Sequence, residues 1–327
     1  MGIANVDFER RNYFDNMGVA VTGASGVDKV LELAGLNYEV EKKPIFFEDK
    51  VGISILNGPV ETQSLYTPVP NSFATVRTDT KAPLGIVGKN YEILQNREAF
   101  DFLDNLLLEG AKFCQASSYG KDGSKSFITM STDPIKVLDD DIMPYILFMN
   151  SFDGSGSIKA MLTPIRVFCS NALARAMKQA INRISIRHSR SMQEKLKVAH
   201  EILLANTKYL EEMKKSAEKL AVTSFTENQF YDFAKNTLYP LPEGENTELV
   251  VVRNQAQIEH LMQAYKQNDL DNFKDSAWRA IQAVADAESH ALTFRKTKTI
   301  DQTNFNTVVM GMPLMNLVWD RMEALVR

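Results

Sequence analysis

The chain lacks the features that mark membrane and secreted proteins. None of its 327 residues belong to an apolar run approaching the about 18 residues that a membrane-spanning helix needs. The N-terminal residues also show no apolar stretch of the secretory type. The two cysteines, Cys114 and Cys169, are expected to be reduced core thiols in an unexported chain. We therefore expect a cytoplasmic protein without a membrane partner.

Residue patterns that carry catalysis or metal binding are equally scarce. The four histidines form no HExxH motif and no cluster with a cysteine, and the sequence has no Gly-x-Ser-x-Gly elbow. The three adjacent carboxylates at 139–141 point in different directions, which favours a solvated turn over a cation site. The sequence therefore predicts no catalytic constellation, no metal site and no cofactor.

A glycine-containing segment at 21–26 has some features of a dinucleotide-binding turn, and Glu41 lies at a plausible distance after it. That turn requires a buried strand before the glycines and a third glycine where the helix packs. Here the preceding residues are polar and the third glycine is absent. A glycine-rich N-terminal loop is the favoured interpretation.

Positive charge is concentrated in one segment of an otherwise acidic chain. Hydrophobic residues at 44% and charged residues at 24% are typical of a soluble globular protein. Residues 157–197 contain nine Lys or Arg and one acid, Glu194, a net charge of +8; because the chain carries −4, the remainder sums to −12. Such a segment indicates a polyanion partner. The alternative is a solvated surface paired with some of the 41 acids.

The order of patterns predicts an α+β fold with a central antiparallel β-sheet and a hairpin–helix core. Residues 1–70 are expected to be irregular, with a short helix at 27–34, strands near 38–47 and 52–56, and a connecting loop at Pro59, Pro68 and Pro70. Residues 71–190 are expected to form the α+β core. Its expected elements are strands at 74–78 and 85–87, a helix capped by Asn96 that ends at Leu108, and two hairpins that turn at 121–123 and at Asp153-Gly154.

A basic helix is expected to begin near Ser170, with Leu173, Met177, Ala180, Ile181 and Ile184 facing the core. We expect the nucleic-acid-binding residues in and beside it to be Lys159, Arg166, Arg175, Lys178, Arg183, Arg187, His188 and Arg190. Aromatic residues are scarce in this segment. Base stacking would have to come from the sheet, through Tyr119, Phe127, Tyr145, Phe148 or Phe152.

Residues 191–327 are predicted to be largely helical. Apolar residues between Met192 and Leu220 alternate at steps of four and three, a heptad pattern interrupted by Asn206, and predict one long helix. It would pack either along another helix of the same chain or in a homo-oligomer. Thr226 and Gln229 predict a capping box. Further helices are expected near 249–267, 272–293 and 306–326.

Several segments together resemble the phage/plasmid-like family built around domain of unknown function 932. The matching segments are 33–40 with Lys43-Pro44, Arg77 with 84–87, 91–96, 151–155, 162–167, 171–173, Arg187-His188 and Ala277-Trp278. Where the family usually carries Gly-Thr before the last pair, this chain has Asp275-Ser276. The resemblance implies an origin in a mobile element, a phage or plasmid, of a bacterial host. It implies no established activity.

The order of elements is also similar to phage single-strand annealing proteins, and this more distant similarity favours a homo-oligomer. Our leading hypothesis is a non-enzymatic single-stranded nucleic-acid-binding protein, with single-stranded DNA as partner, that acts in recombination or replication. The first alternative is an interaction protein that inhibits a host defence or another host protein. The second is an enzyme whose site is assembled from distant residues such as Asp153 and His188.

Overall fold

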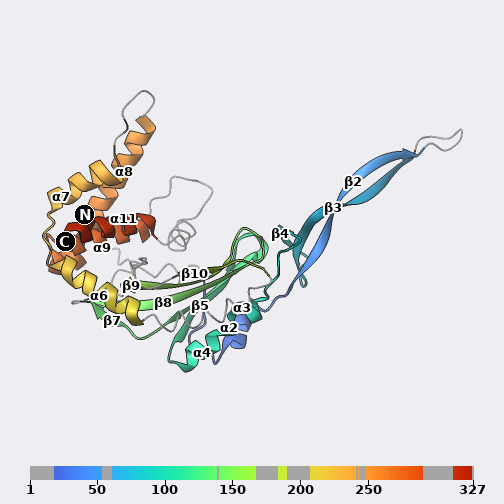
Figure 1. The fold of residues 1–327 in the computed structure, drawn as a ribbon, viewed down its shortest axis with the longest axis horizontal. Helices are drawn as coiled ribbons and strands as arrows, with labels where there is room; N and C mark the ends of the chain where they lie inside the picture. The colour runs from blue at the N-terminus through green and yellow to red at the C-terminus, as the bar shows by residue number, and fades with distance from the viewer. Residues whose placement is uncertain are drawn as a thin grey trace, which may run out of the picture.

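A computed structural model describes residues 18–53, 61–137, 140–166, 183–189, 207–240, 242, 248–289 and 312–325. Within these residues the chain forms a large antiparallel sheet, a helical layer built from the C-terminal half, and a long β-ribbon that extends away from the body (Figure 1). The α+β prediction and the largely helical C-terminal half are confirmed. None of the described helices is long and apolar enough to cross a bilayer.

The larger sheet has the strand order β1-β5-β6-β8-β9-β10, with β7 paired to β8, and its neighbours are antiparallel. The strands are β1 (Val19–Ala20), β5 (Lys112–Tyr119), β6 (Lys125–Ser131), β7 (Ile135–Val137), β8 (Asp140–Ser151), β9 (Ile158–Arg166) and β10 (Arg183–Ile186). Both predicted hairpins are present, β5–β6 and β8–β9. The sheet therefore has a central hairpin pair, as the turn signals indicated.

Each face of this sheet packs on a separate core, because successive side chains of a strand point to opposite faces. On β8, Ile146 and Phe148 face a core shared with the N-terminal helices, whereas Leu147 and Met149 face a core shared with the C-terminal helices. The N-terminal helices are α2 (Val27–Leu33), α3 (Asn96–Phe100) and α4 (Leu103–Leu108). This explains why the strand reads as a nearly continuous apolar run.

The C-terminal layer surrounds α9, whose residues are all buried. Its elements are α6 (Thr207–Ala221), α7 (Glu227–Phe233), the π-helical turn η2 (Ala234–Leu238), α8 (Glu248–Tyr265), the 3₁₀ segment η3 (Asn268–Phe273), α9 (Ala277–Ser289) and α11 (Pro313–Leu325). Trp278 of α9 meets Trp319 of α11 edge to face at 5.6 Å. The capping box of Thr226 and Gln229 opens α7 as predicted.

The expected long heptad helix is present only in part. Its last seam residues Met213, Ala217 and Leu220 are fully buried in α6, in the core that α9 and α11 also form. The seam from Met192 to Asn206 lies outside the described residues. The longest described helix is the 18-residue α8. The described end of the seam therefore packs within the chain.

Much of the described part of residues 1–70, which were expected to be irregular, forms a β-ribbon. Strands β2 (Val40–Ile53) and β3 (Glu61–Arg77) pair from Val40 opposite Arg77 to Ile53 opposite Glu61, with one irregularity where 69–72 of β3 have no partner in β2. Strand β4 (Pro83–Gly88) pairs with the base of β3 (Figure 1). The predicted loop at Pro68 and Pro70 is wrong, because both lie inside β3. Proline is tolerated in a ribbon whose strands have an open edge, where no partner needs its missing N–H.

The predicted basic helix is wrong over its C-terminal part. Residues 183–186 form β10, antiparallel to β9, with Ile184 opposite Ala160 and Ile186 opposite Ile158. The sequence Arg-Ile-Ser-Ile alternates polar and β-branched residues with a period of two, which is the pattern of a half-buried strand. The start of the expected helix, from Ser170 to Asn182, lies outside the described residues.

Candidate nucleic-acid interface

The candidate nucleic-acid interface lies on β9 and β10. Lys159 pairs with Ser185 across the two strands, and the hydroxyl oxygens of Ser157 and Ser185 are 2.6 Å apart. Arg187 follows β10 and is exposed. Neither strand contains an acidic residue. The described part of the predicted interface is therefore a polar strip with positive charges and no carboxylate of its own.

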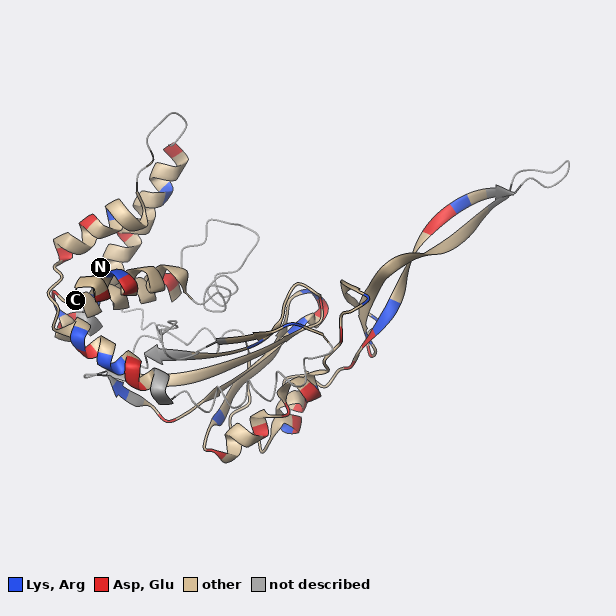
Figure 2. Cartoon of the chain, viewed as in Figure 1, with Lys and Arg blue, Asp and Glu red and all other residues tan. Residues whose placement is uncertain are grey.

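The eight predicted site residues are not all described. The side chains of Lys159, Arg187 and His188 are described, Arg166 and Arg183 are placed as strand positions opposite Ile142 and Met161, and Arg175, Lys178 and Arg190 lie outside the described residues. Figure 2 shows acids and bases mixed over the helices, with few charges on the central strands of the larger sheet. The strip combines several of these bases on two neighbouring strands without an acid in either strand.

His188 does not lie where a phosphate contact would require it. Its side chain is 7% exposed, and its ring stacks on Tyr91 with centroids 4.8 Å apart. Burial lowers the pKa of His188, and this effect outweighs the opposing influence of the Glu92 backbone and the Asp153 charge. His188 is thus a neutral, packed residue, which corrects its expected role as a nucleic-acid contact.

The sheet aromatics expected to stack on bases belong to the two cores. Phe127, Phe148 and Phe152 are at most 2% exposed. Tyr119 and Tyr145 are partly buried against the core of the C-terminal helices. Stacking on a base requires an accessible ring face. The described sheet therefore offers charge rather than aromatic platforms.

The turn at 151–156 organises the polar residues next to this strip. The carboxylate of Asp153 accepts hydrogen bonds from the Ser151 hydroxyl and from the backbone N–H and hydroxyl of Ser155, and Lys125 lies 3.3 Å from it. Burial favours the neutral acid, but the bonds from Ser155 and Ser151 and the Lys125 charge together lower the pKa of Asp153. The ionised carboxylate holds its own turn in shape.

The structure brings Asp153 near His188, but not as an acid–base pair open to a substrate. Burial, and after it the Asp153 charge, raises the pKa of Tyr91 and of Tyr119. The same charge opposes the lowering of the His188 pKa by burial. All the same, the carboxylate is engaged by Ser151, Ser155 and Lys125, and His188 is buried. This arrangement stabilises the turn and supplies no exposed general base.

The three-stranded sheet of the ribbon packs tightly on the same turn. A Cβ on Gly85 of β4 would lie 2.5 Å from the Asp153 Cα, so the two backbones touch. The Thr75 hydroxyl donates a 2.7 Å hydrogen bond to the Phe152 carbonyl. Gly154, in the predicted hairpin turn, has a positive φ of 73°, and a Cβ there would meet Val87. Glycine is required at both positions.

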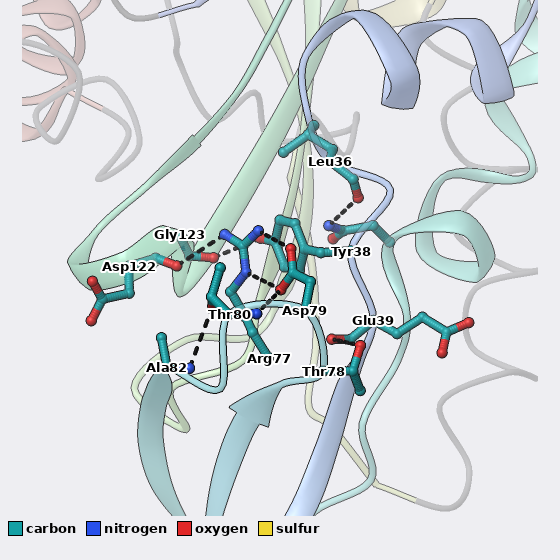
Figure 3. Close-up of polar contacts among 11 residues, drawn as sticks. Leu36, Tyr38, Glu39, Arg77, Thr78, Asp79, Thr80, Ala82, Asp122 and Gly123 are labelled. Atoms are coloured by element: carbon teal, nitrogen blue, oxygen red, sulfur yellow. Dashed lines mark hydrogen bonds and ion pairs between the residues drawn. The ribbon is translucent and has the colours of Figure 1, made fainter.

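Arg77 fastens the base of the ribbon to the β5–β6 turn (Figure 3). Its guanidinium lies 3.9 Å from the centroid of the Tyr38 ring and forms two hydrogen bonds with Asp79, at 3.0 and 2.7 Å. A third bond, at 3.3 Å, reaches the Asp122 carbonyl, and the Tyr38 hydroxyl donates to the Gly123 carbonyl at 2.6 Å. The pair with Asp79 lowers the pKa of that carboxyl to about 2.

Asn96 has a role that sequence reasoning missed. It does not cap α3, because the N-cap residue is Gln95. Its buried side chain instead donates to the Leu36 carbonyl and accepts from the hydroxyl of Ser126 and the amide of Asn150. The network joins α3 to β6 and β8, and the signal available in the sequence was the cluster of matching residues at 91–96. The predicted single helix is also divided into α3 and α4.

The glycine-containing segment at 21–26 leads into α2, as a dinucleotide-binding turn would. The N–H of Val27, at the start of that helix, donates a 2.8 Å hydrogen bond to the Asp104 carboxylate. A phosphate at the same place would be repelled by the Asp104 carboxylate, which already accepts the hydrogen bond from this amide. Separately, the described residues contain no group of three or more His, Cys, Asp or Glu side chains placed to hold a metal ion.

Comparison with known proteins identifies the family but no activity. No curated protein and no solved structure matches the chain. The family described as Domain of unknown function (DUF932) matches residues 83–309, from β4 to beyond α9. The match covers the larger sheet from β5 on, the 151–156 turn, the β9–β10 strip and most of the C-terminal helices, and it begins after the ribbon strands β2 and β3. The chain therefore belongs to the DUF932 family.

Proposed function

We propose that the protein binds single-stranded nucleic acid through the phosphate backbone, along β9 and β10. The observation that carries the proposal is that these adjacent strands and the residue after them contain Lys159, Arg166, Arg183 and Arg187 and no acid. Arg183 and Arg187 take positions four residues apart, about 13 Å along the strand, and Lys159 lies opposite the intervening Ser185. Arg166 is seven residues from Lys159, so its strand position belongs to the other face. Cations gathered on neighbouring strands attract a polyanion.

Phosphate contact rather than base stacking fits the surroundings of the strip. The aromatic rings of the sheet are taken up by the two cores, whereas Arg187 is exposed. Binding of this kind depends steeply on salt and weakly on base sequence. A role in phage or plasmid recombination or replication follows as part of the same proposal, from the resemblance noted in the sequence.

The test is a fluorescence-anisotropy titration of the full chain with single-stranded and double-stranded oligonucleotides at several salt concentrations. The double variant Lys159→Gln/Arg187→Gln should bind more weakly, and its slope of log affinity against log salt should be smaller by about 1.4, because each contact contributes about 0.7. The matched control is Lys235→Gln/Arg253→Gln, which removes two exposed charges from the C-terminal helices.

Equal loss of binding in both double variants would mean that only net charge matters, and the strip would not be the interface. No binding of either oligonucleotide by the wild-type chain at low salt would refute the proposal. Binding of the single strand with an unchanged slope in the strip variant would place the interface elsewhere.

A further inference from the structure

The ribbon of β2 and β3 is a long arm without a core of its own. Beyond the base, where β4 pairs with β3 at 72–76, the two strands pair only with each other, from Phe46 opposite Pro68 to Ile53 opposite Glu61. None of the described side chains at 43–51 and 63–71 is buried. A two-stranded ribbon is marginally stable by itself in water. Pairing with a further strand would therefore stabilise the arm.

Apolar side chains are exposed on both faces of the arm. Phe47, Val51 and Leu65 share one face by register and are 47%, 47% and 55% exposed. Phe46 and Tyr66 share the opposite face and are 51% and 64% exposed. Neighbouring exposed apolar residues of this size mark an interaction surface.

The charge of the arm favours a protein partner over a polyanion. Residues 44–71 contain three acids, Glu48, Asp49 and Glu61, and one base, Lys50, so the segment carries −2. Nucleic acid and anionic lipid would both be repelled. A partner of the arm must instead present apolar side chains and an unpaired strand edge.

The outer edge of β2 provides such an edge. In the smaller sheet the strand order is β2-β3-β4, so one side of β2 has no partner strand among the described residues. No proline interrupts β2 beyond Pro44. A long strand with unpaired N–H and C=O groups is a template for pairing with another chain.

The sequence of β2 is complementary to itself in one antiparallel register. Centring the pair on Asp49 places Glu48 opposite Lys50 of the second copy and Phe47 opposite Val51 of the second copy, each twice by symmetry. Only Asp49 then faces a like charge. Centring the pair on Glu48 or on Lys50 also places two like charges opposite each other, and it forms neither of the two Glu48–Lys50 ion pairs.

We propose that two copies of the chain pair their arms edge to edge through β2, in a two-fold antiparallel register centred on Asp49. The two ribbons become one four-stranded sheet, which has the number of strands that a free-standing sheet needs. The arm precedes the segment that matches the family, so this interface is separate from the proposed nucleic-acid strip.

A charge exchange tests the pairing by sedimentation velocity of the full chain between about 1 and 100 µM. Wild type should form a dimer. Lys50→Glu and Glu48→Lys should each weaken it about tenfold or more, since each places like charges opposite one another, and the double variant should restore it. The matched control is Lys121→Glu, an exposed change at the β5–β6 turn.

Cysteine cross-linking tests the register, in a chain with Cys114→Ser and Cys169→Ser. Directly opposite residues lie about 4.5–5.5 Å apart, within disulfide range, so Asp49→Cys should form a linked dimer. Two Val51→Cys positions would be about 13 Å apart along the strands and should not link.

Three outcomes would overturn the proposal. The first is a monomeric wild-type chain over the whole concentration range. The second is a dimer that survives both single charge variants, or one in which Val51→Cys links as readily as Asp49→Cys. The third is a chain that stays monomeric while the arm variants lose oligonucleotide binding, which would make the arm a nucleic-acid contact.

Discussion

The phenol ring of Tyr91 stacks on the imidazole ring of His188, with centroids 4.8 Å apart and ring planes 22° from parallel. The Tyr91 hydroxyl also donates a 2.7 Å hydrogen bond to the Ser151 carbonyl. Tyr91, three residues after the end of β4, therefore joins the end of β10 to the end of β8. The three segments are far apart in the sequence, and all three lie among those that resemble the family.

The burial of His188 predicts a loss of stability in weak acid. The pKa of His188 is lowered from 6.5 by burial, so in the folded chain the ring takes up a proton only at lower pH. The unfolded chain binds that proton first as the pH falls through about 6.5, which favours unfolding. We expect the free energy of unfolding, measured in urea, to be lower at pH 5.5 than at pH 7.5.

His188→Phe keeps an aromatic ring against Tyr91 and removes the titration, so its stability should vary less with pH over this range. His260→Asn is the matched control, because it removes a histidine that is only partly buried, on α8. If wild type and His188→Phe lose stability in parallel on acidification, another group causes the loss and His188 is not buried as a neutral ring.

The positive φ of Gly154 predicts a large effect of a branched side chain. Gly154→Val should lower the free energy of unfolding by about 1–3 kcal/mol, since the backbone has φ 73° and a Cβ would lie 3.0 Å from Val87 Cγ1. Gly88→Val, on the same strand as Val87, is the control, because nothing lies within 4 Å of its Cβ. Thermal unfolding by circular dichroism measures both; equal melting temperatures would show that the 153–154 turn is not structurally constrained.

Local patterns in the sequence predicted the two hairpins and the cap of α7 correctly. Asp153-Gly154 and the Thr226–Gln229 box depend on turn and capping chemistry within a few residues, and both appear as expected. The antiparallel sheet followed from those turns. Local chemistry of this kind needs no knowledge of the rest of the fold.

The errors arose where distant contacts decide the structure. Residues 183–186 form a strand because β9 offers an edge, and Pro68 lies in a strand because β2 extends alongside it. Asn96 was read as a cap, whereas its partners Ser126 and Asn150 lie 30 and 54 residues away. Of the candidate site, Lys159 and Arg187 could be found from composition, but the burial of His188 depends on Tyr91, which only the fold brings to it.

The contact between Arg77 and Tyr38 predicts a measurable coupling between the arm and the body. Tyr38→Phe removes the 2.6 Å hydrogen bond to the Gly123 carbonyl and should lower the free energy of unfolding by about 1 kcal/mol.

Arg77→Lys keeps the charge but loses the planar group 3.9 Å from the Tyr38 ring. A double-mutant cycle of Arg77→Lys with Tyr38→Leu, followed by urea unfolding, should give a coupling energy of about 0.5–2 kcal/mol. Strictly additive effects would mean that the two groups do not interact.

Glu288 is a buried carboxylate near the end of α9, next to the start of α11. Its two oxygens accept hydrogen bonds from the backbone N–H groups of Leu314 and Met315, at 3.0 and 2.7 Å. Burial raises the pKa of Glu288, although these two bonds oppose the shift. The Glu288 charge also contributes, after burial, to raising the pKa of Tyr239 to about 12. The folded chain therefore favours the protonated acid more than the unfolded chain does.

The sign of the pH dependence follows from that shift. The extra stability is fully present below the unfolded pKa, about 4.5, and is lost as the pH rises through the raised pKa of the folded chain. Glu288→Gln cannot titrate, so the stability of wild type relative to this variant should be greatest near pH 4.5 and smaller at pH 7.5. Glu259→Gln, an exposed change on α8, is the control for loss of one negative charge. A difference that instead grows with pH would show that the amides of α11, rather than burial, decide the ionisation of Glu288.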